Sequence, residues 1–171
     1  DGRFIINGKG GLISPKKVRT DGDWSNAAFF LAAGAIGGAF AYWLGFKAGK
    51  NPYDLRIAVG HDSRLSAGPL TEALLKGMTM FGAECYDAGL ASTPAMFMST
   101  VLPQLDFDGA VMITASHLPW NRNGFKFFTK EGGLGKPDIK AILEKASSYA
   151  DDLTPDSVRV FFVDDGSELM D

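Results

Sequence analysis

The sequence predicts an α/β fold: a three-layer α/β/α sandwich with a mixed, mostly parallel sheet. Short β-branched or aromatic runs alternate with amphipathic helical segments, an order typical of βαβ units. The chain has 171 residues, which is enough for one domain with a sizeable core. Its apolar content of 46% and charged content of 22% are ordinary values for a globular protein.

The predicted strands are short apolar runs that end at polar or glycine-containing turns. The run from Gly109 to Thr114 is uncharged and β-branched, which indicates a buried strand. The run from Gly124 to Phe128 follows closely enough to be its hairpin partner. In chain order, the predicted strands are 4–6, 55–59, 83–88, 109–114, 124–128 and 158–163.

The predicted helices are recognised by their ends and by their apolar spacing. Ser66 is the expected N-cap of a helix that has Pro69 in its first turn. Between Ile139 and Ala146, apolar residues recur at the i, i+3, i+4, i+7 spacing of an amphipathic helix. The predicted helices are 27–46, 66–81, 93–102 and 136–149.

The most informative feature is the loop that follows the strand at Gly109. Ser116 and His117 come directly after the strand, and Lys126 stands ten residues after the serine. α/β proteins usually bind ligands at the carboxyl ends of their strands, so a serine there faces a crevice. No Gly-x-Ser-x-Gly elbow surrounds Ser116, which argues against a hydrolase triad.

Two parts of this loop carry a family resemblance. Residues 114–119 read Thr-Ala-Ser-His-x-Pro and residues 123–126 read Asn-Gly-x-Lys. Together they resemble the phosphoserine loop of the α-D-phosphohexomutases, the phosphoglucomutase and phosphomannomutase family. The resemblance implies that phosphorylated Ser116 exchanges its phosphoryl group with a hexose phosphate through a bisphosphate intermediate. It also implies that His117 and Lys126 hold the phosphate or move the proton of the sugar hydroxyl.

A second turn supports this assignment. Residues 60–64 resemble the Gly-x-Asp-x-Arg turn of the same family, with Gly60, Asp62 and Arg64 at the matching positions. Asp62 and Arg64 stand two residues apart and are expected to pair and to support the serine loop. Asn121 and Asn123 are expected to shape that loop.

The resemblance also implies a domain organisation. Residues 1–26 are interpreted as an N-terminal loop segment, 27–163 as domain I of a phosphohexomutase, and 164–171 as the start of a linker to a second domain. The family's magnesium loop belongs to the further domains. Ser116 would therefore contribute to a Mg²⁺ site only through its phosphate, with the other ligands from those domains. This chain alone is expected to bind no cofactor and to be inactive.

The uncharged segment 27–46 leaves two interpretations open. Its 20 residues reach the length of a membrane span. We favour a helix packed on the edge of the sheet, with its outer face covered by further mutase domains or by subunits of an assembly. The function therefore has two candidates: the N-terminal domain of a hexose-phosphate mutase, or a non-catalytic mutase-derived subunit of a larger, membrane-associated assembly.

Composition excludes several other classes. A net charge of −3 argues against a general nucleic-acid-binding protein. With one cysteine, Cys85, and two histidines, neither a disulfide framework nor a His/Cys zinc site is expected. The single cysteine fits a reducing intracellular compartment, either cytoplasm or organelle stroma.

Overall fold

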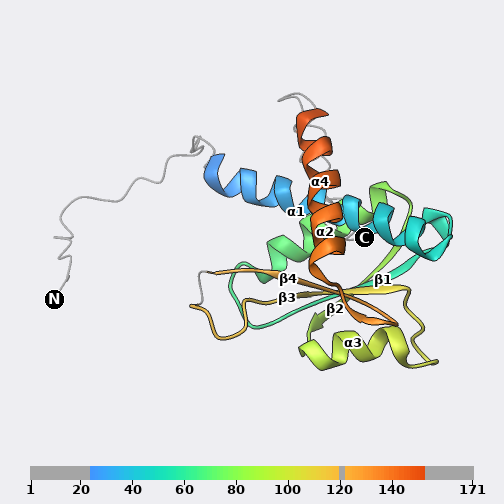
Figure 1. The fold of residues 1–171 in the computed structure, drawn as a ribbon. Coiled ribbons are helices and arrows are strands. Elements are labelled where there is room, and N and C mark those ends of the chain that lie inside the picture. The colour runs from blue at the N-terminus through green and yellow to red at the C-terminus, as the bar shows by residue number, and fades with distance from the viewer. Residues whose placement is uncertain (1–23, 120–121, 153–171) are drawn as a thin grey trace, which may run out of the picture.

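The computed structural model describes residues 24–119 and 122–152, and its centre is one five-stranded mixed sheet (Figure 1). The strands lie in the order β2-β1-β3-β4-β5. β1 is parallel to both β2 and β3, whereas β4 is antiparallel to β3 and to β5. The bounds are β1 Arg56–His61, β2 Glu84–Leu90, β3 Gly109–Ile113, β4 Phe125–Thr129 and β5 Gly132–Gly133.

Helices cover both faces of this sheet. Figure 1 shows α1, α2 and α4 on one face and α3 on the other, so the predicted α/β/α sandwich is confirmed. A single 3-10 turn, η1, leads from α1 into β1. The bounds are α1 Trp24–Ala48, η1 Pro52–Asp54, α2 Ala67–Met80, α3 Thr93–Val101 and α4 Lys136–Asp152.

The core is divided by the sheet into two apolar clusters. Val111 and Ile113 of β3 belong to the larger cluster, under α1, α2 and α4. Ala110 and Met112 of the same strand belong to the smaller cluster, under α3. Because successive side chains of a strand point to opposite faces, a strand covered on both sides must be apolar throughout. Burial on both faces therefore explains why the run that predicted β3 carries no charge.

The helix α1 lies across one face of the sheet, which corrects the prediction that it packs at the sheet edge. Phe40 is fully buried, and its ring lies 4.8 Å from that of Phe127 on β4. Leu44 and Phe40 both reach the backbone of Gly109, where a Cβ would lie within 3 Å of their side chains. An apolar helix in this position needs no charged residue on the face that meets the sheet.

The glycines of α1 explain how closely this helix approaches α2. A Cβ added at Gly77 of α2 would overlap the backbone of Gly34, and one added at Gly37 would overlap the backbone of Leu74. Small residues spaced along a helix allow such backbone contact. The helix that packs against the glycines of α1 is therefore α2, within the same domain.

We predict that Gly77→Ala destabilises the domain by about 1–3 kcal/mol, because the added methyl group forces α1 and α2 apart. Gly68→Ala, in the first turn of the same helix, is the matched control, because a Cβ there meets nothing within 4 Å. That control should be neutral or slightly stabilising. Urea denaturation of both variants checks the prediction, and equal stabilities would contradict it.

The membrane interpretation of α1 is not settled by its composition. Residues Phe30–Ala48 are long and apolar enough to cross a membrane, with a mean hydropathy of 1.2, but core helices of soluble proteins share these properties. In the domain, 44% of that stretch is buried. Tyr42 and Phe46 remain exposed on the outer side. That another protein surface covers them stays a prediction.

Several boundaries differ from those predicted. α1 begins at Trp24 rather than Ala27 and extends to Ala48, and the short strand β5 was not predicted. Two glycines carry no hydrophobic period, so their pairing with β4 leaves no signal in the sequence. The predicted strands 4–6 and 158–163 and the predicted linker 164–171 lie outside the described residues.

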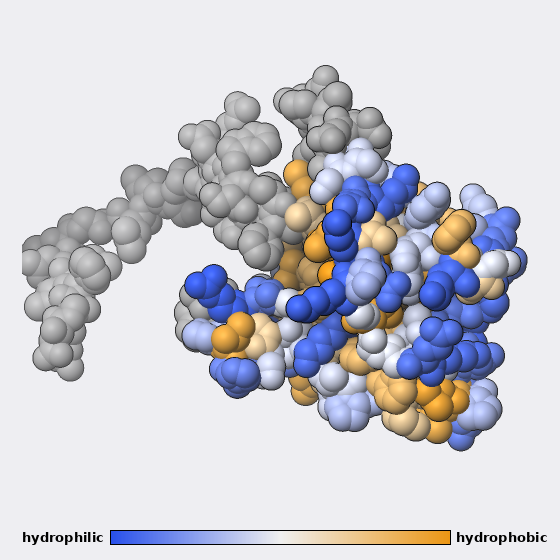
Figure 2. Space-filling view, viewed as in Figure 1, coloured by the Kyte–Doolittle hydropathy of each residue, from blue (hydrophilic) through white to orange (hydrophobic). Residues whose placement is uncertain are grey.

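The surface shows one further concentration of apolar side chains. In Figure 2 apolar residues gather over α3, at the lower edge of the view. Met98 and Val101 of this helix are exposed, as is Leu105 after it. α3 contains no charged residue.

Candidate functional site

The candidate site lies where the neighbouring parallel strands β1 and β3 end. Asp62 follows β1 and Thr114 follows β3, so both turns emerge at the same edge of the sheet. The backbone N–H of Asp62 donates to the carbonyl of Ile113 at 3.1 Å, which extends the pairing of the two strands into the site. The topology thus brings together the two motifs that the sequence indicates.

Ser116 has a left-handed backbone, with φ of +55°. Within the described part of the chain, the only other non-glycine residue with positive φ is Asp106. Such a conformation costs a residue with a Cβ on the order of 1–2 kcal/mol, so surrounding contacts must hold it. Ser116 itself is exposed, which leaves its hydroxyl accessible.

Arg64 supplies most of these contacts, since its guanidinium lies under the serine loop. Its side chain is only 8% exposed. One Nη donates to the carbonyl of Ser116 at 2.9 Å, and the other donates to those of Pro119 and Arg122 at 2.7 and 2.8 Å. Both also reach the carbonyl of Leu118 at 3.2 Å. One planar cation therefore gathers carbonyls from both sides of the loop.

Asp62 orients that guanidinium. Its carboxylate accepts from Arg64 Nε at 2.9 Å and from the Thr114 hydroxyl at 2.8 Å. Partial burial raises the pKa of Asp62, but the hydrogen bonds from Thr114 and Arg64 outweigh this, so its pKa lies below the usual value. Asp62 thus fixes the guanidinium of Arg64, and Arg64 bonds the carbonyls of the serine loop.

A pH dependence follows from this lowered pKa. The stability that Asp62 contributes is complete above its unfolded pKa of about 3.9 and is lost as the pH falls through the lower, folded value. The difference in free energy of unfolding between the protein and its Asp62→Asn variant should therefore shrink below about pH 4. Urea denaturation between pH 2 and pH 7 measures it, and a difference that grows toward acid would contradict the prediction.

The far side of the loop is tied to α2 and to β4. The hydroxyl of Ser66 donates to Asn123 Oδ1 at 3.0 Å. It makes no cap bond, although Ser66 stands at the N-cap position of α2. The predicted N-cap position is thus confirmed, but the cap bond is absent: Ser66 is helical in φ and ψ, and its hydroxyl bonds Asn123 of the loop instead. The backbone of Thr114 donates to the carbonyl of Gly124 at 2.9 Å, which closes the loop at its base.

The other predicted site residues are placed as follows. His117 is exposed directly beside Ser116. Lys126 lies on β4 opposite Met112 and is exposed, and no hydrogen bond joins it to Ser116 in the described residues. Asn121 lies outside the described residues. Gly60 serves packing, because a Cβ there would lie 2.9 Å from that of Ala91.

One residue of the site has no role predicted from the sequence. Thr114 is expected as the end of a strand and as the first residue of the Thr-Ala-Ser-His-x-Pro motif, but no role is predicted for its side chain, which bonds both Asp62 and the Ser116 backbone. Threonine is common in strands, so the residue type gives no sign of this role, and only its place in the motif beside Ser116 could have pointed to it.

Metal ligands and a cysteine nucleophile are two further kinds of group that could carry chemistry in the described residues. The described residues contain no group of three or more His, Cys, Asp or Glu that could hold a metal ion. Burial raises the pKa of the Cys85 thiol to about 12, which makes this cysteine a poor nucleophile at neutral pH.

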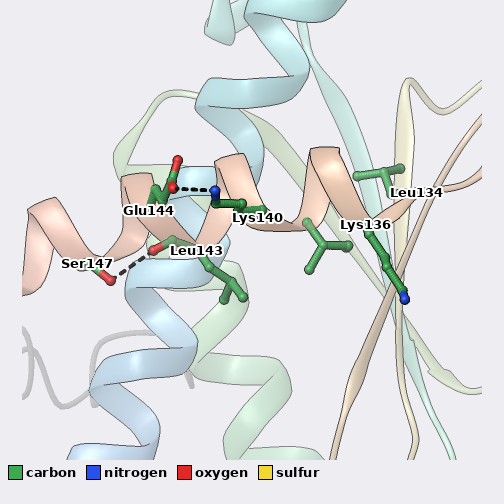
Figure 3. A pocket seen from close by; sticks show the side chains of 7 residues that line it. Leu134, Lys136, Lys140, Leu143, Glu144 and Ser147 are labelled. Carbon is green, nitrogen blue, oxygen red and sulfur yellow. Dashed lines mark hydrogen bonds and ion pairs between the residues drawn. The ribbon is translucent and has the colours of Figure 1, made fainter.

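A shallow groove on α4 shares no residue with this site (Figure 3). Its charged side chains pair along the helix, Lys140 with Glu144 at 3.6 Å, and Ser147 donates to the carbonyl of Leu143. Such pairs are ordinary features of an exposed helix surface.

Comparison with known proteins identifies relatives of the whole described domain. The family model for phosphoglucomutase/phosphomannomutase, α/β/α domain I, matches residues 26–152. The phosphomannomutase/phosphoglucomutase of Pseudomonas putida is 35% identical over 117 residues, which are 67% of this chain and 24% of that protein. The phosphoglucosamine mutase of Caldicellulosiruptor bescii is 42% identical over 77 residues, 45% of this chain and 17% of that protein.

A solved structure agrees with these matches. A Thermus thermophilus protein assigned as a phosphomannomutase has a TM-score of 0.58 and 27% identity, over 68% of this chain and 26% of its own. The chain thus spans about a quarter or less of the length of these relatives.

Proposed function

Because the chain belongs to the phosphoglucomutase/phosphomannomutase family, through its α/β/α domain I, we propose that it is the N-terminal domain of a phosphohexomutase with Ser116 as phosphoryl carrier. One observation carries this proposal: Ser116 is exposed and left-handed, at a loop end that a buried arginine holds in place. A serine held this way can present its Oγ in one direction, which phosphoryl transfer requires.

The proposed reaction moves a phosphoryl group between two positions of a hexose phosphate. The P–O bond to Ser116 Oγ breaks while a P–O bond to a sugar hydroxyl forms. The hydroxyl proton passes to a base, and the departing Ser116 Oγ takes up a proton. The resulting bisphosphate turns around and returns its other phosphate to Ser116. His117 stands next to the serine and is our candidate for proton transfer. Lys126 is our candidate for balancing phosphate charge once a substrate is bound.

Mg²⁺ would neutralise charge on the transferring group. This chain would offer one ligand, the phosphate on Ser116, while the other ligands would come from further domains. For the same reason, residues 1–171 alone are expected to be inactive with hexose phosphates.

Peptide mapping of the native protein tests the role of Ser116. Phosphate should be found on the peptide that contains Ser116. Coupled assays of the full-length protein with glucose 1-phosphate, mannose 1-phosphate and glucosamine 1-phosphate then identify the sugar. A mutase-active protein that carries phosphate only on other serines would overturn the assignment.

The second candidate function, a non-catalytic subunit of a larger assembly, has support from α1. Phe46 is 84% exposed and Tyr42 is 48% exposed on a helix whose first charged residue is Lys47. Burying such side chains against another domain or subunit removes apolar surface from water. Alkaline carbonate extraction separates the interpretations: release favours a packed helix, and retention in the pellet favours a membrane-inserted one. We place the protein in a reducing intracellular compartment, consistent with its single free thiol.

A further inference from the structure

Thr114 lies between the two halves of the site and is 7% exposed. Its hydroxyl is 2.8 Å from Asp62 Oδ2 and 2.9 Å from the backbone nitrogen of Ser116. Its own backbone N–H donates to the carbonyl of Gly124. The side chain therefore touches both the Asp62–Arg64 pair and the serine that the proposed reaction uses.

The donor and acceptor roles in this chain of bonds follow from its chemistry. Asp62 pairs with Arg64 and is ionised, so its carboxylate can only accept. The single proton of the Thr114 hydroxyl must then be donated to Asp62. A lone pair of the same oxygen then accepts the hydrogen bond from the Ser116 N–H. Donation to Asp62 polarises the hydroxyl, which makes its oxygen a better acceptor.

The direction of the Ser116 N–H has a consequence for its side chain. Because this N–H is held inward by Thr114 and the carbonyl of Ser116 is held by Arg64, both peptide groups of the serine are anchored. A residue anchored on both sides can be kept at a φ of +55° that it would not adopt alone. Within the described residues, no hydrogen bond holds the Oγ of Ser116 in addition.

We propose that Thr114 is a positioning residue whose hydroxyl links the Asp62–Arg64 pair to the Ser116 backbone and so holds the serine in its left-handed conformation. The proposal rests on the proposed function for its kinetic consequence, but its structural part stands independently. The branched Cβ of threonine restricts χ1, which keeps the hydroxyl between its two partners.

The kinetic test uses two variants of the full-length protein. Thr114→Val keeps the side-chain shape and removes both hydrogen bonds, and kcat should fall about 10- to 100-fold with KM nearly unchanged. Thr114→Ser keeps the hydroxyl and should restore most of kcat. The matched control is Thr71→Val, which removes a buried hydroxyl that donates to the carbonyl of Ala67 within α2 and should leave kcat unchanged.

A second measurement does not depend on activity. The Ser116 amide should exchange its hydrogen more slowly than the neighbouring His117 amide in NMR spectra of the unsubstituted protein. Thr114→Val should remove this protection, whereas Thr71→Val should retain it. Melting curves establish which variants are folded, and the comparison within the unsubstituted protein needs no variant.

The outcomes separate the two levels of the argument. A protein that turns over no hexose phosphate but shows the protected Ser116 amide would overturn the proposed function and leave the positioning role intact. A Ser116 amide that exchanges as fast as that of His117, or a folded Thr114→Val variant with full kcat, would overturn the positioning role.

Discussion

Replacing Ser116 with alanine is expected to abolish hexose-phosphate turnover by the full-length protein, because the proposed carrier of the phosphoryl group is lost. The free energy of unfolding should change by no more than about 0.5 kcal/mol. The hydroxyl is exposed, and the left-handed backbone is equally unfavourable for serine and for alanine. Steady-state kinetics and thermal unfolding of the same preparation measure the two effects.

The control for this substitution is Ser147→Ala, another exposed serine on the outer side of α4. It should retain full activity. A Ser116→Ala protein that turns over substrate at the unsubstituted rate would contradict the assignment. A Ser116→Gly variant adds a test of the backbone: it should also be inactive, but more stable than Ser116→Ala by about 1 kcal/mol, because glycine adopts positive φ freely.

Replacing Arg64 with lysine is expected to lower kcat about 10- to 100-fold and to destabilise the domain by about 2 kcal/mol. The positive charge is kept, but an ammonium group cannot reach the carboxylate of Asp62 and the loop carbonyls together. The carbonyls of Ser116 and Pro119 lose their donors, so the serine is less well fixed. Kinetics and urea denaturation measure the two effects.

Arg122→Lys is the matched control, because Arg122 belongs to the same loop and is exposed. It should change neither quantity appreciably. If Arg64→Lys and Arg122→Lys behave alike, the guanidinium of Arg64 does not hold the loop in the way described.

Much of the fold could be predicted because its signals are local. The uncharged run that forms β3 indicates a strand that is buried on both faces. The apolar spacing from Ile139 to Ala146 indicates that α4 has one buried face. These patterns arise from the periods of strand and helix, which are properties of the chain itself. The helices and strands predicted within the described residues are all present, although several ends moved by a few residues and the two-residue strand β5 was missed.

Less of the candidate site than of the fold could be predicted. The motif around Ser116 and the turn around Asp62 indicated the two segments that form the site. Because Asp62 and Arg64 stand two residues apart in one turn, the sequence also predicted that they pair. That Arg64 donates its remaining N–H groups to loop carbonyls was not predictable, since backbone carbonyls look the same in every sequence. The bond between Ser66 and Asn123 joins residues far apart in the chain and takes the place of the expected cap bond.

The sequence by itself determined the fold class and the family motif, and it singled out Ser116 as the proposed phosphate carrier, because these depend on residue types at fixed spacing. Only the tertiary structure decided which groups hold that serine. Placing β1 beside β3 brings Asp62 within hydrogen-bond distance of Thr114, and the buried Arg64 then meets the loop from below. The same packing decided the role of the uncharged helix in the domain, where the glycines of α1 meet the backbone of α2. Contacts of this kind depend on distances in space, and spacing along the chain does not encode them.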